Sequence, residues 1–533
     1  MTQAIIAGFI ALLVLFIYTV IKQYLAGLRP KNFPPGPPTV PFLAHSGIRW
    51  TEWKKSYGDV LGLKLAGRNV VILNSWRGVR EYVLIVPVTD KTDNISLMDK
   101  RGAVYSSRLP GHIIDVASGG PGFHLLLSPY GNAWRKQRKV LQGLLSITAV
   151  DKALPVQSAE ASSNLYLLLK EPKDWYNHIR RYSTAVILAT VYAQRGLRFE
   201  ARRVRDLYDV QDRFSFLLER THPPVDDFPI LKYLPEFLAP WKKEAREIRR
   251  DQKALFEELY YETKAKMEEQ EMDCFMAKMI KDFEKNGLEE AIMAQIGGIF
   301  MEAGSDTTAG TLLAWVVAMA KYPEVQKKAQ KELDAVCGSS RSPTPEDISE
   351  LHYVRACVTE TLRWRPIAPG GIPHATTEDD TYNGHFIPKD TVVIANIWAI
   401  HHDEEIYDRP EEFIPERFLN NKYGTREEPT PEDAEHRRQV YTFGGGRRVC
   451  PGQHLAVNSL IINTAKMLWA FDIVPEDPNI DVNVETAFTE GAAIAPYNCP
   501  INFNVRSPQH AALIEKEMES MKEFLDNFDV KEE

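Results

Sequence analysis

Residues 441–456 read YTFGGGRRVCPGQHLA, with three consecutive glycines and two arginines directly before one cysteine. Glycine costs conformational entropy and is kept where the main chain needs unusual dihedral angles or approaches another group closely. Cys450 stands where an apolar, helix-like pattern begins, so amide N–H groups and the helix dipole could stabilise its anion. A thiolate is the form of cysteine that binds a metal. The stretch therefore predicts a turn that presents Cys450 to a metal-containing group.

The residues around this cysteine suit a flat partner. Residues 444–446 would let the turn fold tightly, Pro451 suits a first helical turn, and Gly452 lets the backbone come close. Arg448 could pair with an anion at the rim of the partner. A planar iron porphyrin carrying carboxylates meets each requirement, and an axial thiolate favours O–O cleavage at its iron. A glycine-rich turn before a buried cysteine is the structural alternative.

The spacing of five residues in this stretch also resembles a known signature. Phe443, Gly446, Arg448, Cys450 and Gly452 match the haem-thiolate motif of the cytochrome P450 monooxygenases at every fixed position. The resemblance implies the cytochrome P450 fold, haem b ligated through Cys450, and O2 as co-substrate.

A second stretch points to the opposite side of such a cofactor. Residues 288–323 are apolar nearly all round and end at a proline, which predicts a buried helix. Its AGSDTT segment, residues 303–308, resembles the oxygen-binding segment of the family. The resemblance implies that Asp306 and Thr307 deliver protons into a site that excludes bulk water, and that Gly304 leaves room for dioxygen. A threonine in a buried helix otherwise bonds its own backbone.

A third signal is structural. The ETLRWRP stretch places Glu360 and Arg363 three positions apart, on one face of a helix, where they can form an ion pair. PERF, residues 415–418, resembles the partner segment of the family. Arg417 is therefore implied to join the pair in a buried charge cluster that supports the haem side. Loss of one partner would leave an unpaired buried charge.

The fourth signal concerns the haem carboxylates. WRKQR places Trp134 and Arg138 on one predicted helix, and GIPHATTED contains His374. By resemblance these three residues and Arg448 hydrogen-bond the haem propionates. A surface arginine or a loop histidine would be the ordinary reading of each alone.

Length and composition indicate the size of the domain and the class of fold. The chain has 533 residues, 44% of them hydrophobic, enough for one large core, and we expect a single catalytic domain over residues 42–510. A formal charge of -8 gives no reason to expect a nucleic acid partner. The five cysteines are scattered, which predicts neither a disulfide framework nor a zinc site. Strand-like composition occurs at 60–74 and 391–400 and a long surface helix at 241–270, so the expected fold is mainly α with small β-sheets.

The N-terminal segment predicts membrane attachment. Residues 4–21 carry no charge, and Lys22, Arg29 and Lys31 follow them, which indicates a single-pass helix within residues 1–24 and a cytoplasmic body. A cleaved signal peptide is the alternative. Residues 25–41 are rich in proline and form either a semi-rigid hinge or an ordinary loop. These features match the microsomal branch of the family, which implies the endoplasmic reticulum membrane.

The C-terminal tail shows a helical pattern. Residues 511–533 carry apolar side chains at helical spacing among acids and lysines, which predicts a docked or frayed helix.

Electrons must come from another protein, because no flavin or nicotinamide motif is visible. The resemblance implies an NADPH-dependent flavoprotein reductase in the membrane. Arg437, Arg438 and Arg447 are candidates for its docking patch, with a solvated loop as the alternative. By resemblance, the substrate pocket is lined from residues 109–127, 214–228, 367–373 and 488–493 and from the buried helix before Asp306. These segments are mostly apolar, which favours a hydrophobic small molecule. The chain is similar in style to fungal secondary-metabolism members.

Three hypotheses remain at this point. The first is a haem-thiolate monooxygenase. The second is an isomerase or dehydratase on the same scaffold that rearranges a peroxide without a reductase, and the intact Asp306–Thr307 pair argues against it. The third is a haem-binding protein without turnover.

Overall fold

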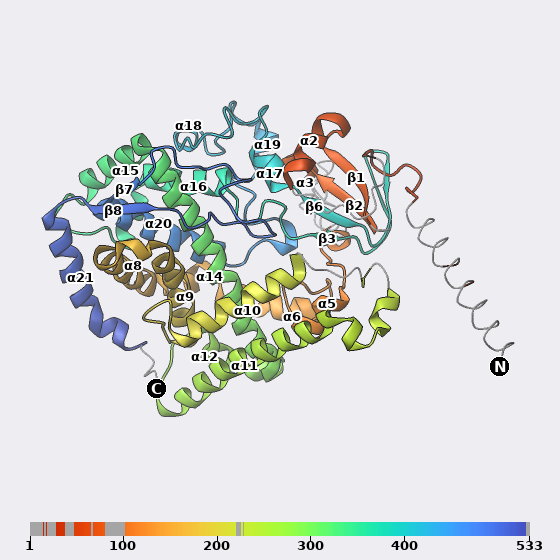
Figure 1. Cartoon of the computed structure of the whole chain (residues 1–533), viewed down its shortest axis with the longest axis horizontal. Coiled ribbons are helices and arrows are strands. Elements are labelled where there is room, and N and C mark those ends of the chain that lie inside the picture. Colours follow the sequence, from red (N-terminus) through yellow and green to blue (C-terminus); the bar gives the residue numbers. More distant parts are fainter. Residues whose placement is uncertain are drawn as a thin grey trace. The chain divides into compact units, whose positions relative to one another are not determined.

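The computed structural model describes residues 28–37, 47–65, 68–79, 102–219, 225–226 and 229–528, together with Val14 and Tyr18 (Figure 1). The predicted membrane helix at residues 4–21 lies outside these residues apart from Val14 and Tyr18. No helix within the described ranges has both the length and the apolar character needed to cross a bilayer.

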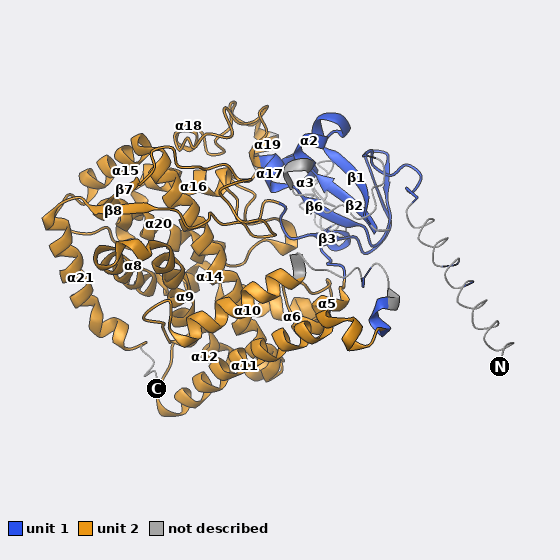
Figure 2. Cartoon of the chain, viewed as in Figure 1, with its two compact units in different colours: residues 1–109, 224–233, 370–400 blue, residues 110–223, 234–369, 401–533 orange. Residues whose placement is uncertain are grey.

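The chain forms two compact units from interleaved segments (Figure 2). Unit 1 contains residues 1–109, 224–233 and 370–400, and unit 2 contains residues 110–223, 234–369 and 401–533.

Unit 1 is built on a four-stranded sheet with strand order β1-β2-β6-β3. Strands β1 and β2 form an antiparallel hairpin in which Val60 pairs with Leu73, and β6 adds to β2 in parallel. Buried aliphatic side chains of β1 and β2, including Leu61 and Ile72, form its core. The elements of unit 1 are β1 (Val60–Leu65), β2 (Arg68–Leu73), β3 (His374–Ala375), β4 (Asp380–Tyr382), β5 (His385–Ile387), β6 (Val392–Ala395), α2 (Gly47–Tyr57) and α3 (Trp76–Val79).

The predicted strand at 60–74 is confirmed as β1 and β2, but the one at 391–400 is only half right. Strand β6 ends at Ala395, and the following residues form α17 (Ile397–His401). Asn396 explains the change, because its side-chain oxygen accepts a hydrogen bond from the Ala399 N–H at 3.2 Å and so caps a helix start.

The proline-rich segment packs against the sheet of unit 1 over residues 29–37. The Gly62 N–H of β1 donates to the Pro35 carbonyl at 2.8 Å. Arg29 donates to the carbonyls of Pro34 at 3.1 Å and Gly62 at 3.0 Å. A side chain at Gly36 would collide with the Gly62 carbonyl, so glycine permits this close approach.

Unit 2 is mainly helical. Its elements are α5 (His112–Ser118), α6 (Asn132–Leu144), α7 (Ile147–Asp151), α8 (Leu154–Lys170), α9 (Trp175–Tyr192), α10 (Arg202–Glu219), α11 (Pro240–Glu269), α12 (Phe275–Lys281), α13 (Phe283–Asn286), α14 (Glu290–Lys321), α15 (Pro323–Val336), α16 (His352–Trp364), α18 (Arg417–Asn420), α19 (Pro431–His436), α20 (Gln453–Ala470), α21 (Pro508–Asp526) and the antiparallel pair β7 (Phe471–Pro475) and β8 (Ile501–Val505).

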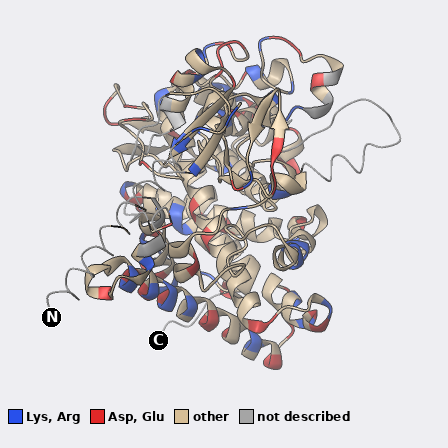
Figure 3. Cartoon of the chain, turned by 90° about the vertical axis from the view of Figure 1, so that its right-hand side faces the viewer, with Lys and Arg blue, Asp and Glu red and all other residues tan. Residues whose placement is uncertain are grey.

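The two long helices predicted from the sequence are confirmed. Helix α14 is apolar all round and contacts α9, α11, α16 and α20 (Figure 1), so it is buried along most of its length. It ends where Pro323 starts α15. Helix α11 carries both signs of charge beside a buried apolar side, and Figure 3 shows Lys and Arg on the same helices as Asp and Glu.

Candidate functional site: the cysteine loop and the long helix

The loop before Cys450 has the backbone that its glycines predict. Gly444 and Gly446 adopt φ of 69° and 58°, values that residues with side chains rarely adopt. The loop closes through the Cys450 N–H, which donates to the Phe443 carbonyl at 2.9 Å. Residues Gly446–Arg448 form a single 3₁₀ turn, and α20 starts at Gln453. Cys450 therefore stands just before a helix N-terminus, as the sequence indicates.

Burial acts against the stabilisation of the Cys450 anion that the sequence pattern predicts. Burial raises the pKa of the Cys450 thiol, while the Gly452 N–H and the positive charge of Arg138 act in the opposite direction without outweighing it. Burial therefore opposes the stabilisation of the anion that the helix terminus and the cations provide. A coordinating metal deprotonates a thiol outright, so ligation would supply the anion.

Arg448 and Arg138 lie beside this loop. Arg448 donates to the carbonyls of Ser128 at 2.7 Å and Leu125 at 3.3 Å, and its guanidinium lies 4.2 Å from the Trp134 ring centroid. Arg138 donates to the Val449 carbonyl. Burial lowers the pKa of both arginines, and the charge of Arg138 lowers that of Arg448 further. Arg138 is buried and Arg448 is half-buried, and two neighbouring guanidinium groups that repel each other form a site suited to an anion.

The residues fit a haem with its carboxylates. The buried Nε of Arg138 has no hydrogen-bond partner among the described residues, and a propionate would provide one. Trp134 is buried, at 5% exposure, beneath Arg448. Ala303 is exposed in the middle of α14, between buried Met301 and Ser305. A flat, anionic macrocycle held by Cys450 suits all of these features.

His374 lies in unit 1, on β3. Its Nδ1 lies 2.7 Å from the Tyr105 carbonyl, so Nδ1 carries the proton of that hydrogen bond. This bond fixes the ring orientation. The propionate contact predicted for His374 stays a prediction.

The α14 segment places Asp306 and Thr307 at consecutive positions near the centre of the helix. The Thr307 hydroxyl donates to the Ala303 carbonyl at 2.6 Å. Burial raises the pKa of Asp306, opposed by the charge of Arg180 and reinforced by that of Asp212. Desolvation therefore favours the protonated carboxyl, which is the form that can donate a proton.

Sequence reasoning missed the residues that face Asp306. Arg180 on α9 lies 3.8 Å from the ring centroid of Tyr208, and both interact electrostatically with Asp306. Asp212 on α10 raises the pKa of Asp306, because its like charge opposes ionisation of the Asp306 carboxyl. No local motif marks these residues, since they come from separate helices.

Gly304 has a packing role in this structure. A Cβ at Gly304 would come within 2.5 Å of the Ile187 side chain on α9. Its lack of a side chain therefore lets the two helices pack closely. The predicted room for dioxygen stays a prediction.

The charge cluster forms with the geometry that its spacing indicates. Arg363 contacts Glu360 through two hydrogen bonds of 2.7 and 2.8 Å, and Arg417 donates to Glu360 at 3.1 Å. Glu360 and Arg363 are fully buried. Arg363 also donates to the carbonyls of His401 and Pro410, both at 2.9 Å, so the cluster fixes the chain that leads toward the cysteine loop.

His401 is a supporting residue that sequence reasoning missed. Its Nε2 accepts a hydrogen bond from the Tyr441 N–H at 2.9 Å, at the start of the cysteine loop. Burial, together with the charge of Arg363, lowers the pKa of His401 to about 3. The imidazole is therefore neutral and able to accept.

The three arginines of the predicted reductase patch are half-buried. Arg447 bonds the Tyr130 hydroxyl and lies 5.2 Å from the centroid of its ring. Burial lowers the pKa of Arg438. Docking at Arg437, Arg438 and Arg447 stays a prediction.

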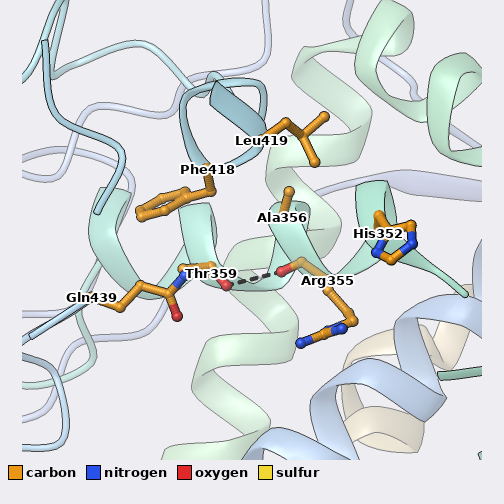
Figure 4. A pocket seen from close by; sticks show the side chains of 7 residues that line it. All are labelled: His352, Arg355, Ala356, Thr359, Phe418, Leu419 and Gln439. Carbon is orange, nitrogen blue, oxygen red and sulfur yellow. Dashed lines mark hydrogen bonds between the residues drawn. The ribbon is translucent and has the colours of Figure 1, made fainter. Parts of the chain in front are cut away.

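Two of the segments predicted to line the pocket, those that begin at Ile367 and Phe488, meet beside α14. The Ile494 N–H donates to the Ile367 carbonyl at 2.8 Å, and Phe488 packs with Ile494 against Ala314. A separate surface pocket of about 200 Å³ lies over α16 and α18 (Figure 4). It is lined by His352, Arg355, Ala356, Thr359, Phe418, Leu419 and Gln439, which include none of the predicted site residues.

Comparisons with known proteins show the family to which the chain belongs. The cytochrome P450 family model matches residues 40–494. The chain is 33% identical to cytochrome P450 monooxygenase fogE of Aspergillus ruber, over 97% of this chain and 95% of that protein. It is 34% identical to cytochrome P450 monooxygenase patI of Aspergillus clavatus, over 95% and 94%. A zebra fish cytochrome P450 with progesterone shares the fold at a TM-score of 0.70 and 22% identity, over 87% of this chain and 100% of that one. The chain belongs to the cytochrome P450 family and is one of its haem-dependent monooxygenases.

Proposed function

We propose that this enzyme inserts one atom of O2 into a hydrophobic small molecule, in the biosynthesis of a fungal secondary metabolite. The observation that carries the reaction is the Cys450 loop with the guanidinium groups of Arg138 and Arg448 beside it, because this set fits an anionic haem held by sulfur. Thiolate-ligated haem supplies the O–O cleavage chemistry. Likeness to Aspergillus monooxygenases supports the fungal assignment.

We assign proton delivery to α14. Burial raises the pKa of the Asp306 carboxyl and so favours the protonated form that can donate a proton. The Thr307 hydroxyl can take that proton and pass its own proton on into the site once it rotates away from the Ala303 carbonyl, since a hydroxyl has one donor and two acceptor sites. The apolar residues around α14 exclude bulk water.

Electrons come from an NADPH-dependent flavoprotein reductase in the endoplasmic reticulum membrane. Arg437, Arg438 and Arg447 close to Cys450 would attract an acidic partner surface. The N-terminal apolar segment supports membrane attachment with the catalytic units in the cytoplasm.

Reconstitution with the reductase, NADPH and ¹⁸O2 tests the reaction on a library of apolar metabolites. We expect one labelled oxygen atom per product and no turnover without the reductase. Turnover that needs no reductase and incorporates no label would instead establish the isomerase or dehydratase activity.

Thr307→Ala tests the proton route in the same assay. Product formed per NADPH should fall about tenfold or more, with hydrogen peroxide released instead, because a positioned proton donor contributes at least this much. Thr311→Ala is the matched control, since the Thr311 hydroxyl donates to the Thr307 carbonyl one turn further along α14. Equal coupling in both variants would disprove the role of Thr307.

A further inference from the structure

A buried hydrogen bond between a histidine and a glutamate lies one helical turn before Asp306. Glu302 on α14 accepts a contact of 3.0 Å from His124 Nε2, with side-chain exposures of 10% and 4%. Gln252, fully buried on α11, donates to the other carboxylate oxygen at 2.8 Å. Both carboxylate oxygens are therefore bonded in a poorly solvated place, where an unpaired carboxylate would be costly.

The pair fixes a turn between α5 and α6. The His124 ring stacks on Phe214 of α10, with centroids 5.8 Å apart and planes at 9°. The His124 carbonyl accepts the Ser128 N–H at 2.9 Å and the Ser128 hydroxyl at 2.7 Å. Residues 124–128 thus form a closed turn, and the His124 side chain of this turn is anchored by Glu302 of α14. We call it the 124–128 turn.

The same turn holds the arginine of the cysteine loop. The carbonyls of Ser128 and Leu125 accept the two terminal nitrogens of Arg448, at 2.7 and 3.3 Å. A guanidinium has donors in a rigid fork, so two fixed acceptors define its orientation. A continuous series of contacts therefore runs from Glu302 through His124 and the turn to Arg448, two residues before Cys450.

We propose that Glu302 is a positioning residue for haem binding: through His124 and the 124–128 turn it sets the orientation of Arg448 toward the haem carboxylate. Glu302 itself touches neither the haem nor the reacting atoms in this role. A competing explanation is that Glu302 only holds helices together, since Gln211 of α10 also donates to its backbone carbonyl at 3.1 Å.

A double-mutant cycle on haem release separates the two. Transfer of haem from the holoenzyme to excess apomyoglobin is measured for wild type, Glu302→Ala, Arg448→Gln and the double variant. Glu302→Ala should speed release about tenfold when Arg448 is present and less than about twofold in Arg448→Gln, because residues in one contact network are coupled. Equal acceleration in both backgrounds, or none in either, would overturn the proposal.

Arg213→Gln is the matched control. Arg213 joins α10 to α11 through Asp251 at 2.7 Å without contacting the turn, so its loss should leave haem release unchanged. Acceleration as large as that of Glu302→Ala would assign the effect to helix packing and overturn the proposal. Haem release needs no substrate, so the outcome is independent of which molecule the enzyme oxidises.

Hydrogen exchange of the apoprotein covers the case in which Glu302→Ala does not fold. In the isosteric Glu302→Gln variant, the exchange rates of peptides that cover residues 120–131 and residues 444–450 should both rise at least twofold over the wild-type rates. Loss confined to residues 120–131, or no loss, would mean that the turn does not transmit to the cysteine loop and would refute the proposal.

Discussion

At the scale of single residues, burial decides more of the chemistry than local motif. Cys450, Asp306 and His401 each have a pKa displaced in the direction that disfavours the charged form, and burial is the largest cause in all three. Burial shifts Asp306 toward its protonated form, and His401 stays an acceptor for the cysteine loop.

His401 makes stability depend on pH. Its ordinary pKa of 6.5 falls to about 3 in the folded protein, so the unfolded chain binds the extra proton as pH drops below about 6.5. The stabilisation of the folded state by neutral His401 is complete above about pH 6.5. Below that pH it is lost by about 1.4 kcal/mol per pH unit. Between pH 6 and pH 4, urea denaturation should show a steeper loss for wild type than for His401→Gln, which retains an acceptor.

His352→Gln is the control, because His352 is exposed at the pocket of Figure 4. Its stability should follow the wild-type pH curve. Parallel curves for wild type and His401→Gln would show that the imidazole is not held neutral.

At the scale of elements, the tail helix α21 shows what a buried charge requires. Lys466 of α20 is fully buried and donates to Glu517 of α21 at 2.6 Å and to Ser342 at 2.7 Å. Ser162 of α8 donates to the same carboxylate oxygen at 2.7 Å. Buried Ile514 and Leu525 add apolar contact. Of the two expectations for this helix, docking is the one that the structure shows.

Removal of the Glu517 carboxylate should therefore destabilise unit 2. Glu517→Ala leaves the Lys466 ammonium buried without its counter-charge, which we expect to cost about 3 kcal/mol in urea denaturation. Adding Lys466→Met should restore most of this loss, because replacing both partners removes the buried charge. Glu519→Ala, exposed on the same helix, should have little effect. An equal loss for Glu517→Ala and Glu519→Ala would contradict the pairing.

The sequence predicted helices and turns correctly where a single local sequence pattern determines the structure. Two such local patterns predicted the observed structure: the mostly apolar sequence of α14, and the glycines before Cys450 that adopt positive φ angles. The helical α17 was missed because β-branched residues continue past Asn396, and only its capping hydrogen bond shows the change. Arg180, His401 and Glu302 were missed because their partners come from distant segments.

At the scale of the whole molecule, buried charge is organised into separate clusters. Besides the Glu360 cluster, Glu160 of α8 bonds Arg181 and Arg195, both at 2.7 Å, inside unit 2. The first cluster was predictable because a family pattern spans it, whereas no pattern links residues 160, 181 and 195. Each cluster fixes segments far apart in sequence, at the cost of stability if one partner is lost.

The most direct test of haem ligation is the absorbance spectrum of the reduced, CO-bound protein. The wild-type protein should show the red-shifted Soret band of a thiolate-ligated haem, and Cys450→Ala should lose it. Cys499→Ala should retain the band, because this half-buried cysteine lies outside the loop. A Cys450→Ala variant with an unchanged red-shifted band would contradict the assignment of Cys450 as the axial ligand.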